Sequence, residues 1–237
     1  MKNQISKHIS IARHIVDGSL NIDSVKEFRS ILRIFPNDPA LHRVYADLQV
    51  RKKSIKAAAA SYRKAGTLYI ESGMMLQAVV CKILEWRLYP PTSLKARRFY
   101  QTLNGGKYHE TLLNVFFNRL SFSEFAALIN RLKRVRIKAG KTIIKIGEQE
   151  KYLYFIAAGH VTATTLHPLA DGQKEAEKSI VYLTENDFFG DIYPFESDKI
   201  SPLAVCALYW MLNMSMALPC TRTSKIPDSR FPCPAKP

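Results

Sequence analysis

From residue 138 to residue 191 the chain reads KAGKTIIKIGEQEKYLYFIAAGHVTATTLHPLADGQKEAEKSIVYLTENDFFGD. Glycines at positions 140, 147, 159 and 190 separate runs of β-branched and aromatic residues that have the length of strands. These runs are 142–144, 152–156, 160–164 and 179–183. Because glycine adopts a positive φ without steric cost, a glycine at each junction favours closely turning antiparallel strands. The sequence therefore predicts an antiparallel β-structure here.

This part of the chain, about residues 112–209, resembles the cyclic nucleotide-binding domain. Bacterial catabolite-activator proteins and the regulatory subunits of cyclic-AMP-dependent kinase belong to that family. The resemblance rests on Ala139-Gly140-Lys141, Ile146-Gly147-Glu148, the run 153–159, Leu183 and Phe189-Gly190-Asp191, in that order. It implies an antiparallel β-barrel of the jelly-roll type that is entered from a helix. Ser121 and Glu124 form a capping-box pattern at the expected start of that helix, with Phe125 and Leu128 behind it.

The resemblance also implies a ligand site directly after the Phe-Gly pair. Members of the family hold the cyclic phosphate with backbone N–H groups at a helix start and with an arginine, while an acidic residue takes the ribose 2′-hydroxyl. The matching positions in this sequence are Phe189, Gly190, Asp191, Ile192, Lys199 and Ser201. Aspartate stands at 191 where glutamate is usual, Ser201 stands where the arginine is expected, and Lys199 is the nearest cation. Two interpretations stay open: a pocket for cyclic AMP or cyclic GMP, or a barrel that no longer binds either.

The first hundred residues have helical periodicity throughout. Apolar stripes lie within 25–32, 41–48, 55–65 and 76–84, and a final helix is expected over 94–103. Asn37-Asp38-Pro39 has the composition of a helix start, and Pro90-Pro91 stops a helix. Ala58, Tyr62 and Ala65 resemble the second helix of a tetratricopeptide repeat, and Ala78 with Tyr89-Pro90 resembles a second copy. His42, Tyr45 and Ala46 replace the Trp, Leu and Gly of that repeat's first helix. The resemblance implies a groove for partner peptides.

The positive charge is concentrated in this helical part. Residues 1–104 carry 18 Lys and Arg against 7 Asp and Glu, a net charge of +11 out of the total of +15. Arg51-Lys52-Lys53 with Lys56, Arg63 and Lys64 favours either an acidic or nucleic-acid partner or a solvated helix face and loop. The charge boundary near Asn104-Gly105-Gly106 separates a helical domain over 1–104 from a cyclic nucleotide-binding-like domain over 107–209. The composition from Pro219 onward, rich in Pro, Ser, Thr and Lys, predicts a divergent, disordered tail over 210–237.

Enzyme, metal and membrane classes have little support in the sequence. The six histidines are scattered, the four cysteines have no C-x-x-C spacing, and no catalytic motif is present. The start lacks a signal-peptide core, and the apolar run over 203–218 has 16 residues where about 20 are needed to span a bilayer. We therefore expect a cytoplasmic protein without a membrane span, catalytic residues, metal or other cofactor. No helix-turn-helix pattern follows the barrel, so sequence-specific DNA binding is not expected.

The overall prediction is an α+β chain with an all-α tetratricopeptide-like domain followed by a cyclic nucleotide-binding-like antiparallel β-barrel. Its predicted function is that of a non-catalytic bacterial signalling or regulatory protein that binds a protein partner through the helices. Two alternatives are a structural scaffold with a relic barrel and electrostatic nucleic-acid binding through the basic helical half.

Overall fold

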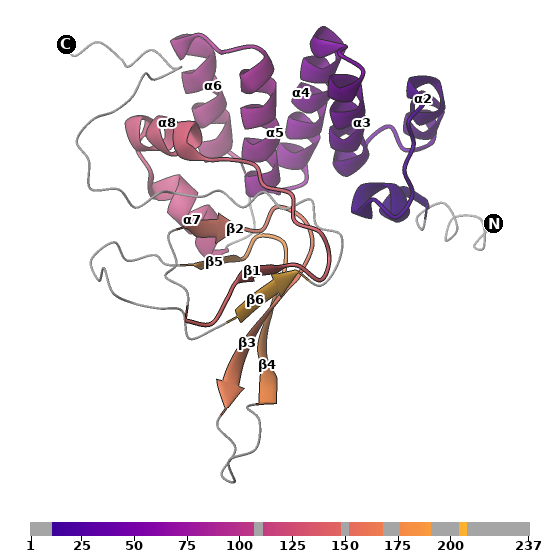
Figure 1. Ribbon diagram of the computed structural model, residues 1–237. Helices are drawn as coiled ribbons and strands as arrows, with labels where there is room; N and C mark the ends of the chain where they lie inside the picture. The colour runs from indigo at the N-terminus through magenta and orange to yellow at the C-terminus, as the bar shows by residue number, and fades with distance from the viewer. Residues whose placement is uncertain (1–10, 107–110, 148–151, 168–175, 191–203, 208–237) are drawn as a thin grey trace. The chain divides into compact units, whose positions relative to one another are not determined.

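The computed structural model describes residues 11–106, 111–147, 152–167, 176–190 and 204–207. Its contacts divide the described residues into two compact units, with the boundary between residues 130 and 131. The described part of the first unit is helical, and that of the second contains all the described strands (Figure 1). The order of helices followed by antiparallel strands confirms the predicted α+β fold class. The predicted boundaries 1–104, 107–209 and 210–237 stay predictions.

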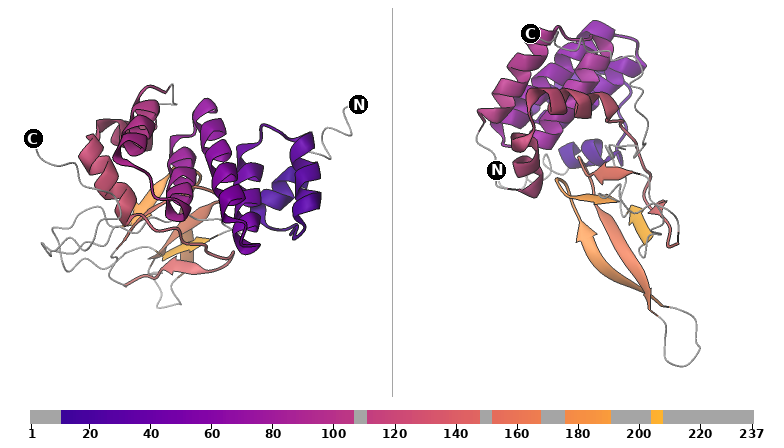
Figure 2. Two further views of the ribbon diagram at one scale, coloured as in Figure 1. Left: turned by 90° about the horizontal axis from the view of Figure 1, so that it is seen from above. Right: turned by 90° about the vertical axis from the view of Figure 1, so that its left-hand side faces the viewer.

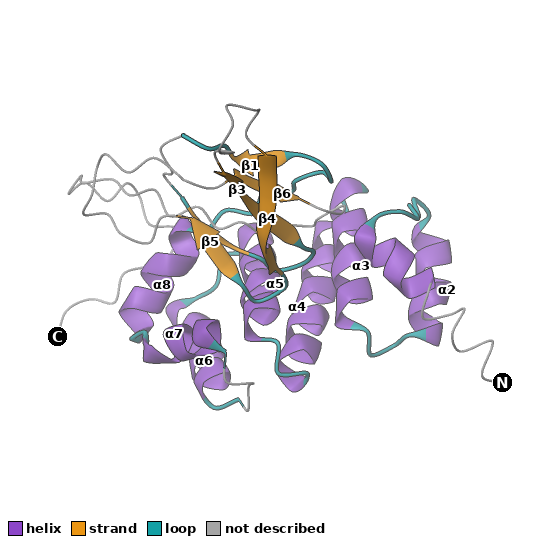
Figure 3. Cartoon of the chain, turned by 90° about the horizontal axis from the view of Figure 1, so that it is seen from below, coloured by secondary structure: helices purple, strands orange, loops and turns teal. Residues whose placement is uncertain are grey.

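The first unit, the helical unit, is a layer of helices joined by short turns (Figures 2 and 3). Its helices are α2 (Val25–Ile34), α3 (Pro39–Arg51), α4 (Ile55–Glu71), α5 (Met75–Leu88), α6 (Ser93–Asn104), α7 (Leu112–Arg119) and α8 (Phe122–Arg131). Helix α4 packs extensively against both α3 and α5. None of the described helices is long and apolar enough to cross a membrane.

Local signals in the sequence set where these helices begin. Asp38 accepts a hydrogen bond from the backbone N–H of Leu41 at 2.9 Å, and Pro39 occupies the first helical position of α3. The capping box of α8 is also present: the Ser121 N–H donates to Glu124 at 2.8 Å and the Glu124 N–H donates to the Ser121 hydroxyl at 3.4 Å. The hydrogen bond from the Ser121 hydroxyl, and to a lesser extent the one from its backbone N–H, holds the pKa of Glu124 below its ordinary value. Both predicted helix starts are confirmed.

The core of the helical unit is built from the apolar stripes. Ala58, Tyr62 and Ala65 are all buried on α4. At Gly66, α4 and α5 are in van der Waals contact, since a Cβ there would lie 3.5 Å from the Cβ of Cys81. Small residues on α4 therefore allow α5 to pack against it. The similarity to tetratricopeptide repeats stays a prediction.

The second unit, the strand unit, has two antiparallel sheets. The strands are β1 (Thr142–Ile144), β2 (Leu153–Phe155), β3 (Val161–His167), β4 (Ala176–Leu183), β5 (Phe188–Gly190) and β6 (Ala204–Ala207). One sheet has the order β1-β6-β3-β4 and the other pairs β2 with β5. Strands β3 and β4 pair antiparallel, and Figure 2 shows them as two long strands side by side. The sheets enclose a core of Ile144, Ile156, Val161, Ala163, Phe189, Val205 and Ala207. Over the described residues no closed barrel forms, so the jelly roll stays a prediction.

Candidate functional site

The candidate site lies where β5 ends, at the Phe-Gly pair that the sequence singled out. Strand β5 runs antiparallel to β2, with Phe188 opposite Phe155, Phe189 opposite Tyr154 and Gly190 opposite Leu153. Both strands have three residues, so each of these pairs is a large part of the sheet. The position of residue 190 is therefore fixed by its partner strand.

Gly190 is the residue that this geometry depends on most. Its φ is +107°, and a Cβ at this position would collide with the carbonyl oxygen of Tyr152 and lie 3.2 Å from its carbonyl carbon. Two independent constraints, positive φ and close backbone approach, thus require glycine. The four glycines that the sequence predicted at the junctions, at 140, 147, 159 and 190, all have positive φ.

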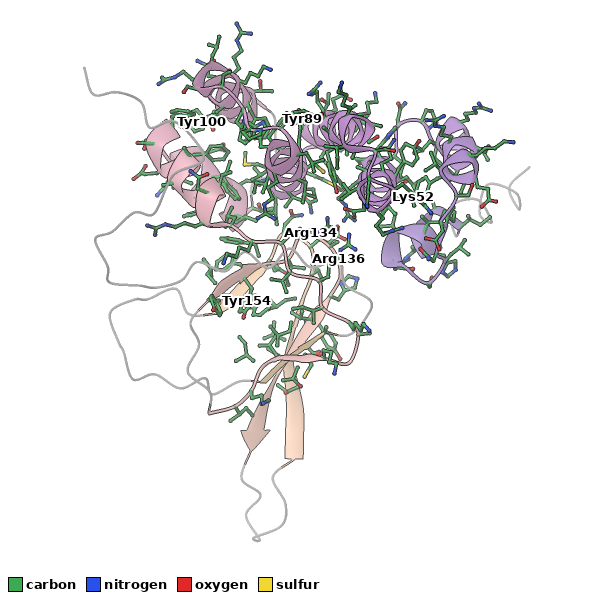
Figure 4. All side chains as sticks on the ribbon, turned by 45° about the horizontal axis from the view of Figure 1, so that its top comes forward. Lys52, Tyr89, Tyr100, Arg134, Arg136 and Tyr154 are labelled. Carbon is green, nitrogen blue, oxygen red and sulfur yellow. The ribbon has the colours of Figure 1, made fainter. Side chains whose placement is uncertain are left out.

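Phe189 has a structural position in the strand unit. Its side chain is buried in the core of the strand unit. Its ring stacks on that of Tyr154, which Figure 4 labels, with centroids 4.9 Å apart and an interplanar angle of 9°. Stacking of this kind stabilises the strand pair beyond the burial of area. Phe189 therefore anchors β5, and Gly190 directs the chain onward.

A polar turn before β5 holds the other end of the strand. The backbone N–H of Thr184 donates to the Asp187 carboxylate at 2.7 Å. The N–H of Ile156 donates to the Asp187 carbonyl at 2.8 Å, and the N–H of Asn186 donates to the Ile156 carbonyl at 2.8 Å. Asn186 has a φ of +73°, a conformation that asparagine tolerates well. Strand β5 is thus fixed at both ends by backbone contacts to the β2 segment.

The remaining predicted site residues, Asp191, Ile192, Lys199 and Ser201, lie outside the residues that the structure describes. The described part of the site is therefore the strand pair that leads into the segment after residue 190. Phe189 and Gly190 are brought together with Tyr152 and Tyr154, two residues that sequence reasoning did not assign to the site. Tyr152 contributes a backbone carbonyl, which no sequence pattern identifies.

Sequence reasoning also missed a buried polar cluster in the helical unit. Arg43 and Asp47 are both buried on α3, one helical turn apart. The Tyr62 hydroxyl on α4 donates to the Asp47 carboxylate at 2.6 Å. Burial disfavours the charged form of Arg43, but Tyr69 and Asp47 outweigh this and raise the pKa of Arg43 above its ordinary value. Tyr69 and then Asp47 thus favour the charged form of the guanidinium inside the helical layer.

A second buried carboxylate joins α4 to α5. Glu85 is buried, and it accepts hydrogen bonds from the Arg63 Nε and the Lys82 Nζ, both at 2.7 Å. The Lys82 ammonium also lies 5.9 Å from the ring centroid of Trp86 and 5.1 Å from that of Phe99. Among the described residues, no group of three or more His, Cys, Asp and Glu side chains could hold a metal ion.

Comparisons with known proteins give matches among solved structures. No protein-family model matches the chain, and no curated protein matches it in sequence. The catabolite activator protein of Thermus thermophilus is 22% identical, with the match covering 44% of this chain and 45% of that one at a TM-score of 0.36. The guanosine-bound regulatory subunit of a cAMP-independent protein kinase A from Trypanosoma cruzi is 21% identical, with 57% and 43% covered at a TM-score of 0.40.

The sensor domain of the transcriptional regulator DNR from Pseudomonas aeruginosa is 19% identical. That match covers 51% of this chain and 73% of that one at a TM-score of 0.39. The match spans less than half the length of the catabolite activator protein and of the kinase subunit. An activator, a regulatory subunit and a sensor domain are thus among the structures to which this chain is similar.

Proposed function

We propose that this chain is a non-catalytic signalling or regulatory protein of bacterial type. In this proposal the helical part binds a protein partner, and the strand-rich part is a cyclic nucleotide-binding-like sensor whose affinity for its ligand is weak. The observation that carries the proposal is the Phe189-Gly190 pair, since a glycine required by both φ and close backbone approach ends β5. In the family that the sequence resembles, the phosphate-binding cassette starts at this place.

The weak affinity follows from the cassette residues. A glycine backbone and Asp191 retain groups that can hold a ribose hydroxyl and one phosphate oxygen. Ser201 presents a hydroxyl where an arginine would supply two parallel N–H donors and a positive charge. Loss of a hydrogen bond to a charged group costs about 1.5–3 kcal/mol, a loss of affinity of roughly 10- to 150-fold. Binding of cyclic AMP or cyclic GMP is then no tighter than the high micromolar range.

A ligand bound in this way acts as a switch only through differential affinity. The chain after Gly190 needs two arrangements, and the nucleotide has to bind one of them more tightly. Contacts to the backbone at Gly190 and to Asp191 would favour the arrangement in which the cassette is closed around the ligand.

Restoring the arginine tests this assignment of the cassette. We expect Ser201→Arg to strengthen binding of cyclic AMP by roughly 10- to 150-fold, because an arginine side chain supplies two parallel N–H donors and a positive charge to the phosphate. Isothermal titration calorimetry of the purified full chain measures the change. Adenosine is the comparison ligand, because it has no phosphate, and its affinity is expected to stay the same. If Ser201→Arg binds cyclic AMP no better than the unaltered chain, the relic-barrel alternative is favoured.

A further inference from the structure

One end of the helical unit carries a cluster of basic residues. Helices α3, α4, α5 and α6 follow one another with short turns, so the α3–α4 and α5–α6 turns lie at the same end, and the α4–α5 turn at the opposite end (Figures 1 and 3). The ion pair between Arg63 and Glu85 shows which parts of the antiparallel helices α4 and α5 lie side by side. From this pair, the start of α4 at Ile55 and the end of α5, where the turn begins at Tyr89, lie in the same direction. We call the exposed residues around these two turns the basic end.

The two stretches of chain that form the basic end carry cations and no acidic residues. The stretches 50–57 and 88–98 contain seven Lys and Arg and no Asp or Glu. Arg51 pairs with Asp23 at 3.7 Å, and Arg97 lies 4.8 Å from the Phe122 ring centroid. Over the described residues, no ion pair involves the exposed cations Lys52, Lys53, Lys56, Lys95 and Arg98. The opposite end has a different character, because it carries Asp38 and Glu71.

Apolar side chains stand among these cations. Ile55, Tyr89 and Leu94 are 36%, 44% and 57% exposed. Each lies at or next to a turn, so these side chains belong to the tip of the helical layer; Figure 4 labels Lys52 and Tyr89. The turns themselves are well defined: Lys53 has a φ of +59°, the Ser54 N–H donates to the Gln49 carbonyl at 2.9 Å, and Pro90-Pro91 stiffens the second turn.

This combination fits an anionic lipid surface. Lysines near such a surface are attracted by its negative potential, and neighbouring aliphatic side chains partition into the interfacial region, where tyrosine is also favoured. A nucleic acid would use the cations but gain little from Leu94 and Ile55. We propose that the basic end docks the protein peripherally on a membrane surface that contains anionic lipids. This proposal does not depend on nucleotide binding or on the partner of the helical part.

Sedimentation of the full chain with lipid vesicles tests the proposal. We expect binding to vesicles of phosphatidylcholine with phosphatidylglycerol, weakened by salt, and little binding to phosphatidylcholine alone. The double variant Lys52→Glu, Lys53→Glu should lower the partition coefficient at least about 25-fold, taking about fivefold for each lost cation. Leu94→Ser should lower it about tenfold, because an aliphatic side chain no longer partitions into the interface.

A charge-matched control separates a local site from general attraction. Arg33→Glu, Lys64→Glu changes the net charge by the same amount at exposed positions in the last turn of α2 and on α4, away from both turns. The proposal requires this control to bind far better than the Lys52, Lys53 variant, with circular dichroism of both unchanged. Equal loss in the two variants, equal binding to neutral vesicles, or no vesicle binding would each overturn it. Binding of a single-stranded oligonucleotide through Lys52 and Lys53, without vesicle binding, would instead make the basic end a nucleic-acid surface.

Discussion

Asp47→Ala is expected to destabilise the helical unit by about 3–5 kcal/mol. The substitution removes the carboxylate that accepts the Tyr62 hydroxyl hydrogen bond and that, after Tyr69, favours the charged form of the buried Arg43 guanidinium. A buried charge left without its partner costs far more than the loss of the pair's own attraction. Urea denaturation followed by far-UV circular dichroism measures the change, because the helical unit supplies most of that signal.

Two controls make this prediction specific. Asp23→Ala removes a carboxylate whose pair with Arg51 is largely exposed, and it should change stability by no more than about 1 kcal/mol. The double variant Arg43→Leu, Asp47→Leu removes both charges and should be more stable than Asp47→Ala alone. A loss for Asp47→Ala no larger than that for Asp23→Ala would show that Arg43 is not held as described.

Gly190→Ala is expected to destabilise the strand unit by about 2–4 kcal/mol. The added Cβ has to leave the Tyr152 carbonyl oxygen, so the β2–β5 pair separates or residue 190 leaves its positive φ. The stacking of Phe189 on Tyr154 depends on the same pair and would be weakened. Near-UV circular dichroism reports these rings, and thermal unfolding reports the stability.

Gly140→Ala is the matched control for this substitution. Gly140 has a similar positive φ of +73°, but an added Cβ there would meet no atom within 4 Å. It should therefore cost only the backbone strain, about 1–2 kcal/mol, and leave the near-UV spectrum unchanged. Equal effects of the two substitutions would mean that the contact with Tyr152 contributes nothing.

The parts of the fold that depend on neighbouring residues could be predicted from the sequence. Asp38-Pro39 and the Ser121–Glu124 box specify helix starts through hydrogen bonds between residues three positions apart. Both partners of each bond can therefore be seen in the local sequence. The glycine positions of the strand unit have the same local character, since positive φ is a property of a single residue.

The parts that depend on distant residues could not be predicted. Arg43 and Asp47 are four residues apart and share a helix face, but only the packing of α4 and α5 decides that this face is buried. The pairing of Leu153 with Gly190 joins strands that are far apart in sequence, and no local pattern sets that register. The role of the Tyr152 carbonyl is a backbone property, which its side chain does not indicate.

The central claim is that the segment beginning at Gly190 is a nucleotide-binding cassette weakened by the absence of its arginine. Isothermal titration calorimetry of the unaltered full chain with cyclic AMP, cyclic GMP and cyclic dinucleotides tests it most directly. We predict binding of cyclic AMP or cyclic GMP with a Kd in the high micromolar range or weaker. A Kd in the low micromolar range or tighter would contradict the assignment of Ser201 to the arginine position and would identify Lys199 as the cation that replaces it.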